Sequence, residues 1–380
     1  MKRKRDLFLL LVAIPLLLAG LQVATWYYRA NSAEVNRDIV SREYPVVSDG
    51  LHNSNTDLIR WKNSYILAHA SSPFHMGSDS SVVHLKISKD LIRWEDLHTV
   101  KIPESDIRDP KLAVIGGELF LYFLRNDGFE PAPSGTYYIK SMGNDLDQWT
   151  NVQQVEPKGW LLWRPRTLDE KTYYTTAYWH EHGKSVLLRS ANGIQWEIVS
   201  EIYSGDRNDE TAMLLRPDGT ILVTARLEGD RSWHQGAFDA RTLIASASPP
   251  YQEWHREFDN SVRLDGPALF LLEGIPYAVG RFDPEGNKEW YGMSSLLGRK
   301  RTSVYRVEPG RLVRLTDLPS GGDTAYPGVV ITEDEVVISY YSNRTDRDFA
   351  WLLGLVLPTD IYIAILNREE LTRAGEIGKD

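Results

Sequence analysis

The stretch that decides the fold is residues 208–226, which read NDETAMLLRPDGTILVTAR. A polar start leads into an apolar strand, Asp218-Gly219 supplies a two-residue hairpin turn, and a second apolar strand follows. Segments of the same form recur at intervals of 46 to 59 residues. The six hairpins begin at Asn53, Asp106, Leu162, Asn208, Leu264 and Asp323.

A second element follows four of these hairpins and places a short polar residue before a Trp, as in Ser88–Trp94 and Ser190–Trp196. The polar side chain closes a turn through local hydrogen bonds, and the Trp packs between sheets. Six repeats of four short strands predict an all-β protein, a six-bladed β-propeller over residues 40–370. We expect Glu43–Val47 to supply the outer strand of the last blade, beside Ile361–Ala364, and so to close the ring.

Composition excludes several classes of protein. Apolar residues make up 42% and charged residues 25% of 380, as in a soluble globular chain rather than a disordered or multi-span membrane protein. The formal net charge of −9 argues against a nucleic-acid partner. The chain has no cysteine, which excludes disulfides and thiolate chemistry. The histidines do not suggest a metal site, and we expect no cofactor.

The N-terminus resembles a membrane signal. Lys2–Arg5 precede the almost wholly apolar residues 7–26, which are long enough to cross a bilayer as a helix. Positive charge before the span places the body outside the cytoplasm, in the periplasm or outside the cell. We therefore divide the chain into a signal anchor at 1–30, the propeller, and a C-terminal tail at 371–380; a cleaved signal peptide and a secreted protein are the alternative.

The residues that open the inner strands are polar or charged in every repeat. In a propeller these positions line one shared cavity, and a ring of mixed charge there indicates a polar ligand. Carboxylates and arginines with aromatics suit sugars, especially acidic ones. The residues concerned are Asn55, Asp57, Arg108, Asp109, Arg164, Arg166, Asp209, Glu210, Asp265, Asp323 and Tyr326.

On these residues the propeller resembles the sialidase superfamily. In that family a Glu opens the inner strand of blade four and an Arg ends the following strand, where this chain has Glu210 and Arg226. The resemblance also matches Arg301 to an Arg of blade five, Tyr326 to a Tyr opening the last blade, and Asp79 to an Asp on the blade-one loop.

The resemblance implies a specific mechanism. Tyr326 is the nucleophile, Glu210 is its base, and Asp79 is the general acid and base. Arg226 and Arg301 would hold the carboxylate of an acidic sugar. The family's third arginine is missing, because Asn55 stands at its place in blade one, so another acidic sugar or the loss of catalysis is also consistent with the sequence.

A weaker resemblance is to five-bladed glycosidases that act on neutral sugars with paired carboxylates. Asp57, Asp109 and Glu210 would be the carboxylates, and Arg108-Asp109-Pro110 carries the likeness. The functions that follow are a sialidase-like glycoside hydrolase, a non-catalytic glycan-binding propeller, or a neutral-sugar glycosidase, with an assembly role at the cell envelope as the last candidate.

Overall fold

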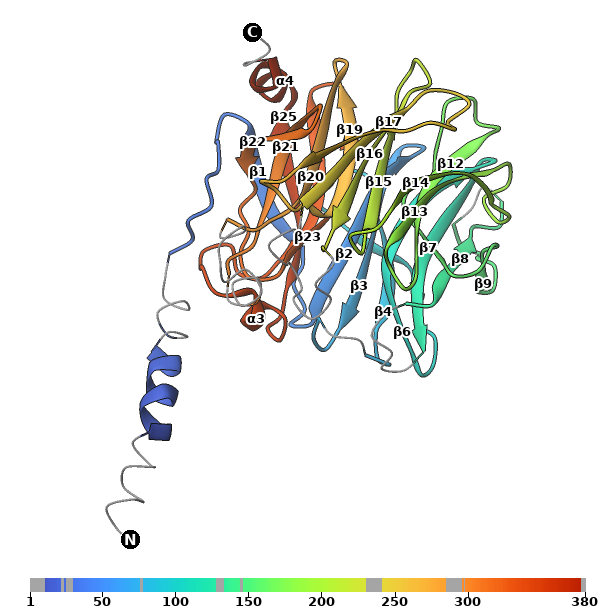
Figure 1. Ribbon diagram of the computed structural model, residues 1–380. Coiled ribbons are helices and arrows are strands. Elements are labelled where there is room, and N and C mark those ends of the chain that lie inside the picture. Colours follow the sequence, from blue (N-terminus) through green and yellow to red (C-terminus); the bar gives the residue numbers. More distant parts are fainter. Residues whose placement is uncertain are drawn as a thin grey trace.

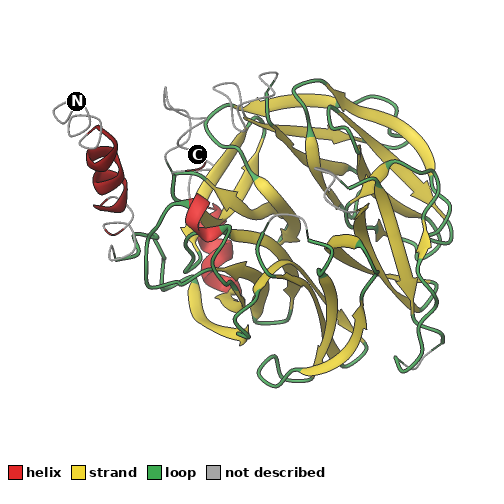
Figure 2. Ribbon diagram, turned by 90° about the horizontal axis from the view of Figure 1, so that it is seen from below, coloured by secondary structure: helices red, strands yellow, loops and turns green. Residues whose placement is uncertain are grey.

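The computed structural model describes residues 11–21, 24, 30–75, 78–127, 133–143, 146–229, 241–284, 296 and 298–376. Within them, antiparallel strands form six separate sheets, and the innermost strands of successive sheets lie next to one another. The sheets are arranged as a ring, which Figure 2 shows from one end. The predicted six-bladed all-β propeller is confirmed.

Each blade is an up-and-down meander that starts at the centre of the ring. Blade one holds β2 (His52–Trp61), β3 (Ser64–Ser72), β4 (Val82–Ser88) and β5 (Glu95–Val100), and blade two holds β6 (Ser105–Ile115), β7 (Glu118–Asp127), β8 (Gly135–Lys140) and β9 (Gln153–Gln154). Blade three has an inner strand in two pieces, β10 (Trp160–Leu162) and β11 (Arg166–Thr167), then β12 (Tyr173–Trp179), β13 (Lys184–Ser190) and β14 (Glu197–Ser204).

The second half of the ring repeats this order. Blade four holds β15 (Asp209–Leu215), β16 (Ile221–Leu227), β17 (Arg241–Ala247) and β18 (His255–Asp259). Blade five holds β19 (Asp265–Leu272), β20 (Ile275–Phe282), β21 (Arg301–Glu308) and β22 (Arg311–Asp317). Blade six holds β23 (Thr324–Ile331), β24 (Glu335–Ser342), β25 (Asp360–Asn367) and, as its outer strand, β1 (Val40–Val47).

The ring closes by pairing the first strand with the last. Tyr44 of β1 pairs with Ile363 of β25, and Glu43 pairs with Ala364, so the last blade contains both ends of the propeller sequence. The expected closing strand at Glu43–Val47 is therefore confirmed. Closure matters for function because a propeller blade cannot bury both of its faces alone.

Apolar side chains between neighbouring sheets hold the blades together. Ile66 and Leu85 of blade one pack in one cluster with Leu119 and Leu121 of blade two, all almost fully buried. The turns are closed by short polar side chains: Oδ1 of Asn192 accepts the N–H groups of Ile194 and Gln195 at 2.9 and 3.0 Å. The blades are thus rigid supports for the residues at their inner ends.

Two short helices lie at opposite ends of the ring (Figure 1). Helix α3 (Trp351–Gly354) lies in an apolar insertion, residues 349–357, between β24 and β25 of the last blade, and α4 (Arg368–Glu376) follows β25. The hydroxyl of Tyr277 donates to the carbonyl of Leu371 at 3.1 Å, which holds α4 against blade five. Residues 371–376, assigned to a tail from the sequence, thus continue a packed helix, and 377–380 lie outside the described residues.

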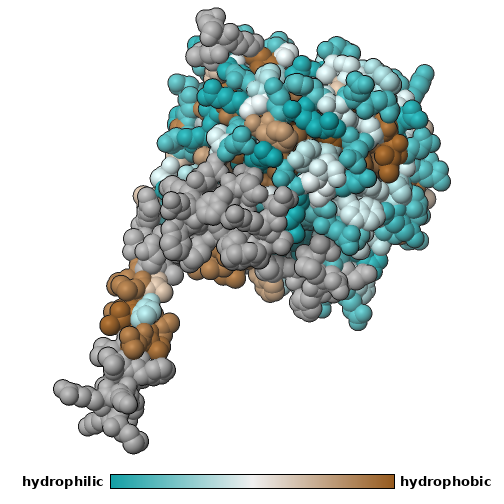
Figure 3. All heavy atoms as spheres, in the orientation of Figure 1, coloured by the Kyte–Doolittle hydropathy of each residue, from teal (hydrophilic) through white to brown (hydrophobic). Residues whose placement is uncertain are grey.

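The predicted membrane anchor at 7–26 lies partly outside the described residues. Residues 11–21 are helical and expose apolar side chains, for instance those of Leu16 and Leu17. In Figure 3 a hydrophobic segment coloured brown projects from the body of the molecule. Across the stretches that the structure describes, no helix combines the length and apolar character that a bilayer crossing requires.

Candidate active site

The inner strands of five blades carry one extra residue near their start, a β-bulge that turns a side chain out of the sheet, and the inner strand of blade three is divided into two pieces. The ladder of β15, for example, skips from Asp209 to Ala212 while its partner advances two residues. In five blades the bulged residue lies in the left-handed region of φ, where residues other than glycine are uncommon. These residues are Asn55, Asp109, Glu210, Gly266 and Tyr326, with φ between 36° and 57°.

Proline explains part of this local geometry. Pro110, Pro267 and Pro327 each follow a bulged residue. Because proline has no N–H to give to the ladder, it favours an interruption of the strand at this point. Side chains from different blades therefore meet at one end of the central channel.

Tyr326 and Glu210 form the central pair of this end. The two residues are 116 positions apart in sequence, yet the Tyr326 hydroxyl donates a hydrogen bond to Oε1 of Glu210. Oε2 of Glu210 accepts the backbone N–H of Gly266 at 2.6 Å, and Nη1 of Arg226 lies 3.0 Å from Oε1. Both side chains are buried, with 8% and 4% of the residue surface exposed. The carboxylate is thus fixed from three directions.

Gly266 makes room for the tyrosine. A Cβ atom at this position would lie 2.8 Å from Cγ and Cδ2 of Tyr326, closer than carbon atoms normally approach. Gly266 also has a φ of +57°, which glycine adopts without steric cost. The ring of Tyr326 therefore lies directly on the backbone of blade five.

Burial sets the protonation of this pair. It raises the pKa of Tyr326 well above 10, and the neighbouring Glu210 carboxylate adds to the effect. Burial also raises the pKa of Glu210, while the positive charge of Arg226 opposes the rise. The proton consequently rests on the tyrosine, next to a carboxylate that is more basic than usual.

Two arginines occupy equivalent places in blades four and five. Arg226 pairs with Asp209 across β15 and β16, and Arg281 pairs with Asp265 across β19 and β20. Arg226 donates to both oxygens of Asp209, at 2.7 and 2.5 Å. Arg281 donates to Asp265 at 3.1 Å, and its guanidinium lies 5.8 Å from the centre of the Tyr326 ring. Internal carboxylates therefore already balance both cations.

These groups line a polar cavity of about 390 Å³ at the end of the channel that also carries α3. Five arginines and five carboxylates contribute to its wall, so its charges balance. A smaller adjoining hollow contains Asn55 and shares Arg108, Asp109 and Tyr326 with the cavity. The charged lining residues are Arg108, Arg207, Arg226, Arg263, Arg281, Asp109, Glu181, Asp209, Glu210 and Glu228, and His75, His180, His182, Tyr178, Pro133, Tyr326 and Trp351 complete the wall.

The apolar insertion at 349–357 supplies part of this wall. Trp351 is buried beside Arg281, whose guanidinium lies 5.0 Å from its ring, and its Nε1 donates to Oδ1 of Asp323 at 2.7 Å. Leu352 and Val356 of the same segment remain exposed. The sequence did not indicate this role, because an insertion has no counterpart in the other repeats.

Several predicted site residues lie within or beside this cavity. Asp109 is half-buried in the cavity wall and accepts a hydrogen bond from Nδ2 of Asn55. Arg108 lines both hollows and is paired with Asp106. Asp265 is buried behind the wall, where Nε and Nη2 of Arg263 both donate to it at 2.8 Å.

Other predicted residues lie elsewhere. Asp79 is exposed and is not part of the cavity wall. Arg301 is buried in a separate cluster, where it donates to Asp348 at 2.8 Å. Asp57 is buried in the channel and accepts from Nε of Arg164 at 2.8 Å, while Arg166 is half-buried in β11 and donates to the carbonyl of Pro165.

Comparison with known proteins finds solved structures that share this fold. No protein-family model and no curated protein matches the chain. Among solved structures, a protein of unknown function from Dyadobacter fermentans aligns with a TM-score of 0.64 at 15% identity, over 86% of this chain and 98% of that one. The endosialidase of phage phi92 aligns with a TM-score of 0.64 at 10% identity, over 86% of this chain and 69% of that one. Trypanosoma rangeli sialidase aligns with a TM-score of 0.59 at 12% identity, over 92% of this chain and 60% of that one.

The chain has the sialidase fold. The described residues of this chain form six blades, whereas the carboxylate-pair alternative was based on five-bladed enzymes. Of the three carboxylates in that alternative, Asp57 does not reach the cavity, because Arg164 and the N–H groups of Leu58 and Leu112 hold it in the channel. The Tyr326–Glu210 pair, by contrast, lies in the cavity wall of this sialidase-like propeller.

Proposed function

We propose that the protein is a sialidase-like glycoside hydrolase that cleaves an acidic glycoside in this cavity. The observation that carries the proposal is the hydrogen bond from the buried Tyr326 hydroxyl to Glu210, two blades away. A neutral tyrosine is a weak nucleophile, and an adjacent base activates it. A tyrosine nucleophile also avoids the repulsion that a carboxylate nucleophile would meet in an acidic sugar.

The chemistry would run in two steps. Glu210 takes the proton of Tyr326 as the phenolic oxygen bonds to the anomeric carbon, and the bond to the leaving oxygen breaks as an acid protonates that oxygen. Water then attacks the anomeric carbon as the bond from that carbon to the Tyr326 oxygen breaks; the same acid group takes a proton from the water, and the released Tyr326 oxygen recovers its proton from Glu210.

We assign the acid and base role to Asp109 in place of Asp79. Asp109 lines the cavity and is close enough to Tyr326 for its charge to raise the pKa of that hydroxyl, whereas Asp79 is exposed outside the cavity wall. The hydrogen bond from Asn55 orients the Asp109 carboxylate. Asn55 would then have a positioning role where sialidases have an arginine.

The acidic group of the substrate would be bound by Arg207 and Arg108. Their side chains are the most exposed of the five cavity arginines, at 40% and 26%, against 11% or less for Arg226, Arg263 and Arg281. All five arginines contact a carboxylate of the protein, Arg108 through Asp106 and Arg207 through Glu228 at 3.5 Å, so exposure is what distinguishes these two from the rest. Exposed guanidinium groups keep the freedom to form bidentate bonds with a sugar carboxylate.

Turnover of aryl glycosides tests the proposal. The full chain is assayed on α-sialosides, uronides, α-arabinosides and β-mannosides, with Tyr326→Phe and Glu210→Gln beside the matched cavity controls Tyr178→Phe and Glu228→Gln. We expect turnover of one acidic glycoside, a loss of at least about 100-fold in kcat for the first two variants, and much smaller losses in the controls. Turnover of a neutral sugar that Tyr326→Phe leaves unchanged would contradict the proposal.

The acid role is tested with leaving groups of different basicity. Asp109→Asn should retain more activity on an activated aryl leaving group than on an alkyl glycoside, because the activated group departs without protonation. Asp79→Asn serves as the control and should behave like the unmodified protein. The opposite result for these two variants would return the role to Asp79.

A glycan-binding propeller without catalysis is the second candidate. The observation that favours it is the neutralisation of Arg226, which donates to both oxygens of Asp209 and also lies near Glu210. Binding of an acidic glycan that is lost in Arg207→Met, with no turnover of any glycoside, would support this candidate over the hydrolase.

We further propose that the propeller is held outside the cytoplasm by a membrane anchor at residues 7–26. The basic residues 2–5 and the exposed apolar side chains of helix 11–21 support this location. Cell fractionation tests it: the protein should stay with the membrane after high-salt washing, and the propeller at residues 40–370 should be cleaved only by protease added outside the cytoplasm. Recovery in the soluble cytoplasmic fraction would refute the anchor.

A further inference from the structure

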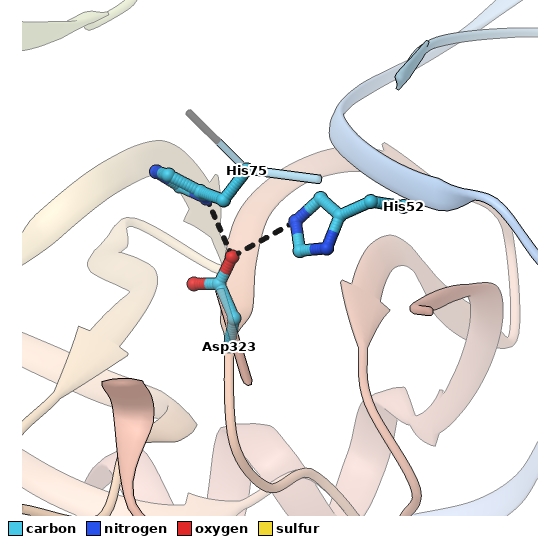
Figure 4. A group of neighbouring side chains, drawn as sticks. All are labelled: His52, His75 and Asp323. Carbon is cyan, nitrogen blue, oxygen red and sulfur yellow. Dashed lines mark hydrogen bonds and ion pairs between the residues drawn. The ribbon is translucent and has the colours of Figure 1, made fainter. Parts of the chain in front are cut away.

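Two histidines and one aspartate meet beside the cavity, at the junction of the first and last blades (Figure 4). His52 opens β2, His75 follows β3, and Asp323 precedes β23. Nε2 of His52 lies 3.1 Å and Nδ1 of His75 lies 2.6 Å from the same oxygen, Oδ2 of Asp323. The three side chains offer one ligand atom each, all within 4.8 Å of one another.

The other oxygen of Asp323 is already occupied. Oδ1 accepts hydrogen bonds from Nε1 of Trp351 at 2.7 Å, the hydroxyl of Tyr341 at 3.1 Å and Nη1 of Arg281 at 3.3 Å. These contacts fix the orientation of the carboxylate, which is fully buried. Oδ2 is therefore directed at the two imidazole rings.

The tautomer of His52 shows what this arrangement lacks. Nδ1 of His52 lies 2.9 Å from the carbonyl oxygen of Leu357, and a contact of that length requires an N–H on Nδ1. A neutral His52 then points the lone pair of Nε2 at the carboxylate oxygen of Asp323. Both groups are fully buried, so two lone pairs face each other where water cannot relieve the repulsion. Either a second proton on His52 or a metal cation between the two groups removes the conflict.

We propose that His52 Nε2, His75 Nδ1 and Asp323 Oδ2 bind a divalent metal ion of the zinc type, and Zn²⁺ is the ion that we expect at this site. Two imidazoles and a carboxylate form a donor set suited to such ions, whereas Ca²⁺ and Mg²⁺ prefer oxygen ligands. A backbone carbonyl on the far nitrogen of a ligating histidine is a usual orienting contact, and Leu357 supplies it here.

A metal ion at this site would connect two chain segments that border the cavity. His75 lines the cavity, and its backbone N–H donates to the carbonyl of Leu355 at 2.8 Å, which joins the segment after β3 to the insertion that carries Trp351. A metal ion on His75 would fix this segment to blade six, while the partial exposure of His75 leaves a fourth coordination position toward the cavity.

Zinc binding to the full chain tests the proposal without any glycoside. The chelator-treated protein is titrated with Zn²⁺ and its stoichiometry and affinity are measured by calorimetry. His75→Asn is compared with the control variant His84→Asn. His84 belongs to another histidine pair in the same blade, in which the rings of His69 and His84 stack with their centres 4.9 Å apart. Melting curves without metal establish that both variants fold.

We expect one Zn²⁺ per chain, an affinity at least about 100-fold weaker in His75→Asn, and an unchanged affinity in His84→Asn. Zn²⁺ should raise the melting temperature of the unmodified protein and of His84→Asn but not of His75→Asn. X-ray absorption should show two imidazoles on the metal, with nitrogen at about 2.0–2.1 Å. No binding, equal binding in both variants, or binding of Ca²⁺ alone would overturn the assignment, as would a doubly protonated His52 in the metal-saturated protein.

Discussion

The close contact between Gly266 and Tyr326 gives a prediction whose size follows from the geometry. Gly266→Ala adds a Cβ 2.8 Å from Cγ of the tyrosine ring, where an ordinary carbon contact is roughly 3.5 Å. Either the ring retreats by about 0.7 Å or the two blades separate. Forcing an extra methyl group into a packed site costs about 1–3 kcal/mol, and an alanine in the left-handed region costs about 1 kcal/mol more.

Gly274→Ala is the matched control. Gly274 lies in the same blade with a φ of +77°, but an added Cβ would meet no atom within 4 Å, so this variant carries the backbone cost alone. With an unfolding entropy of roughly 2 cal/mol/K per residue, 1 kcal/mol corresponds to about 1–2 °C in a chain of this size. Gly266→Ala should therefore melt a few degrees below Gly274→Ala in differential scanning calorimetry.

The same displacement should reduce activity. With Tyr326 as the proposed nucleophile, a shift of its ring by about this distance should lower kcat by roughly 100-fold, whereas Gly274→Ala should keep its turnover. Equal melting temperatures and equal rates for the two variants would refute the argument that glycine is required beneath the tyrosine.

Three further predictions concern buried charge, pH and the turns. Arg226→Met leaves the carboxylates around it without a counter-charge, so it should lower the free energy of unfolding, measured in urea, by about 3–5 kcal/mol. The surface variant Arg189→Met should lower it by less than about 1 kcal/mol, and similar losses in the two variants would contradict the role of the buried charge. Burial lowers the pKa of His69 from 6.5 to about 3, so the folded protein disfavours the protonated ring. Above pH 6.5 the ring is neutral in both states and costs nothing, but the free energy of unfolding should fall by about 3 kcal/mol as the pH drops from 6.5 to 4. His69→Leu should flatten the loss of stability between pH 6.5 and 4, and an unchanged pH profile would exclude this cause. Asn192→Ala removes the acceptor of two backbone N–H groups and should cost about 1–2 kcal/mol by the same urea assay, with no change counting against the role of the turn.

The sequence predicted the fold well because the repeat is local. Each inner strand begins within two residues of its expected start, since the apolar pattern and the hairpin turns decide that position. The contact between Tyr326 and Glu210 follows from the same repeat: both stand at the equivalent bulge, and equivalent positions meet at one end of the ring.

The rest of the site depends on contacts that no repeat encodes. Arg281 lines the cavity while Arg301 binds Asp348, and the difference lies in which carboxylate each guanidinium reaches after the blades have packed. The pattern of Asp265 opposite Arg281 and Asp209 opposite Arg226 is the signal that would have separated them. Trp351 was missed because its place depends on how an insertion folds back over the channel.

The candidate active site is also a product of ring closure. Glu210 belongs to blade four, the N–H that binds it comes from Gly266 of blade five, and Tyr326 belongs to blade six, which is completed by β1 from the start of the propeller. Loss of β1 would expose the outer edge of blade six and loosen the support of Tyr326, although no residue of β1 is among those that line the cavity. Closure thus links the first strand of the propeller to the geometry of a pair that lies about 280 and 170 residues further along the chain. Because Tyr326 and the closing strand share blade six, the position of the tyrosine depends on ring closure.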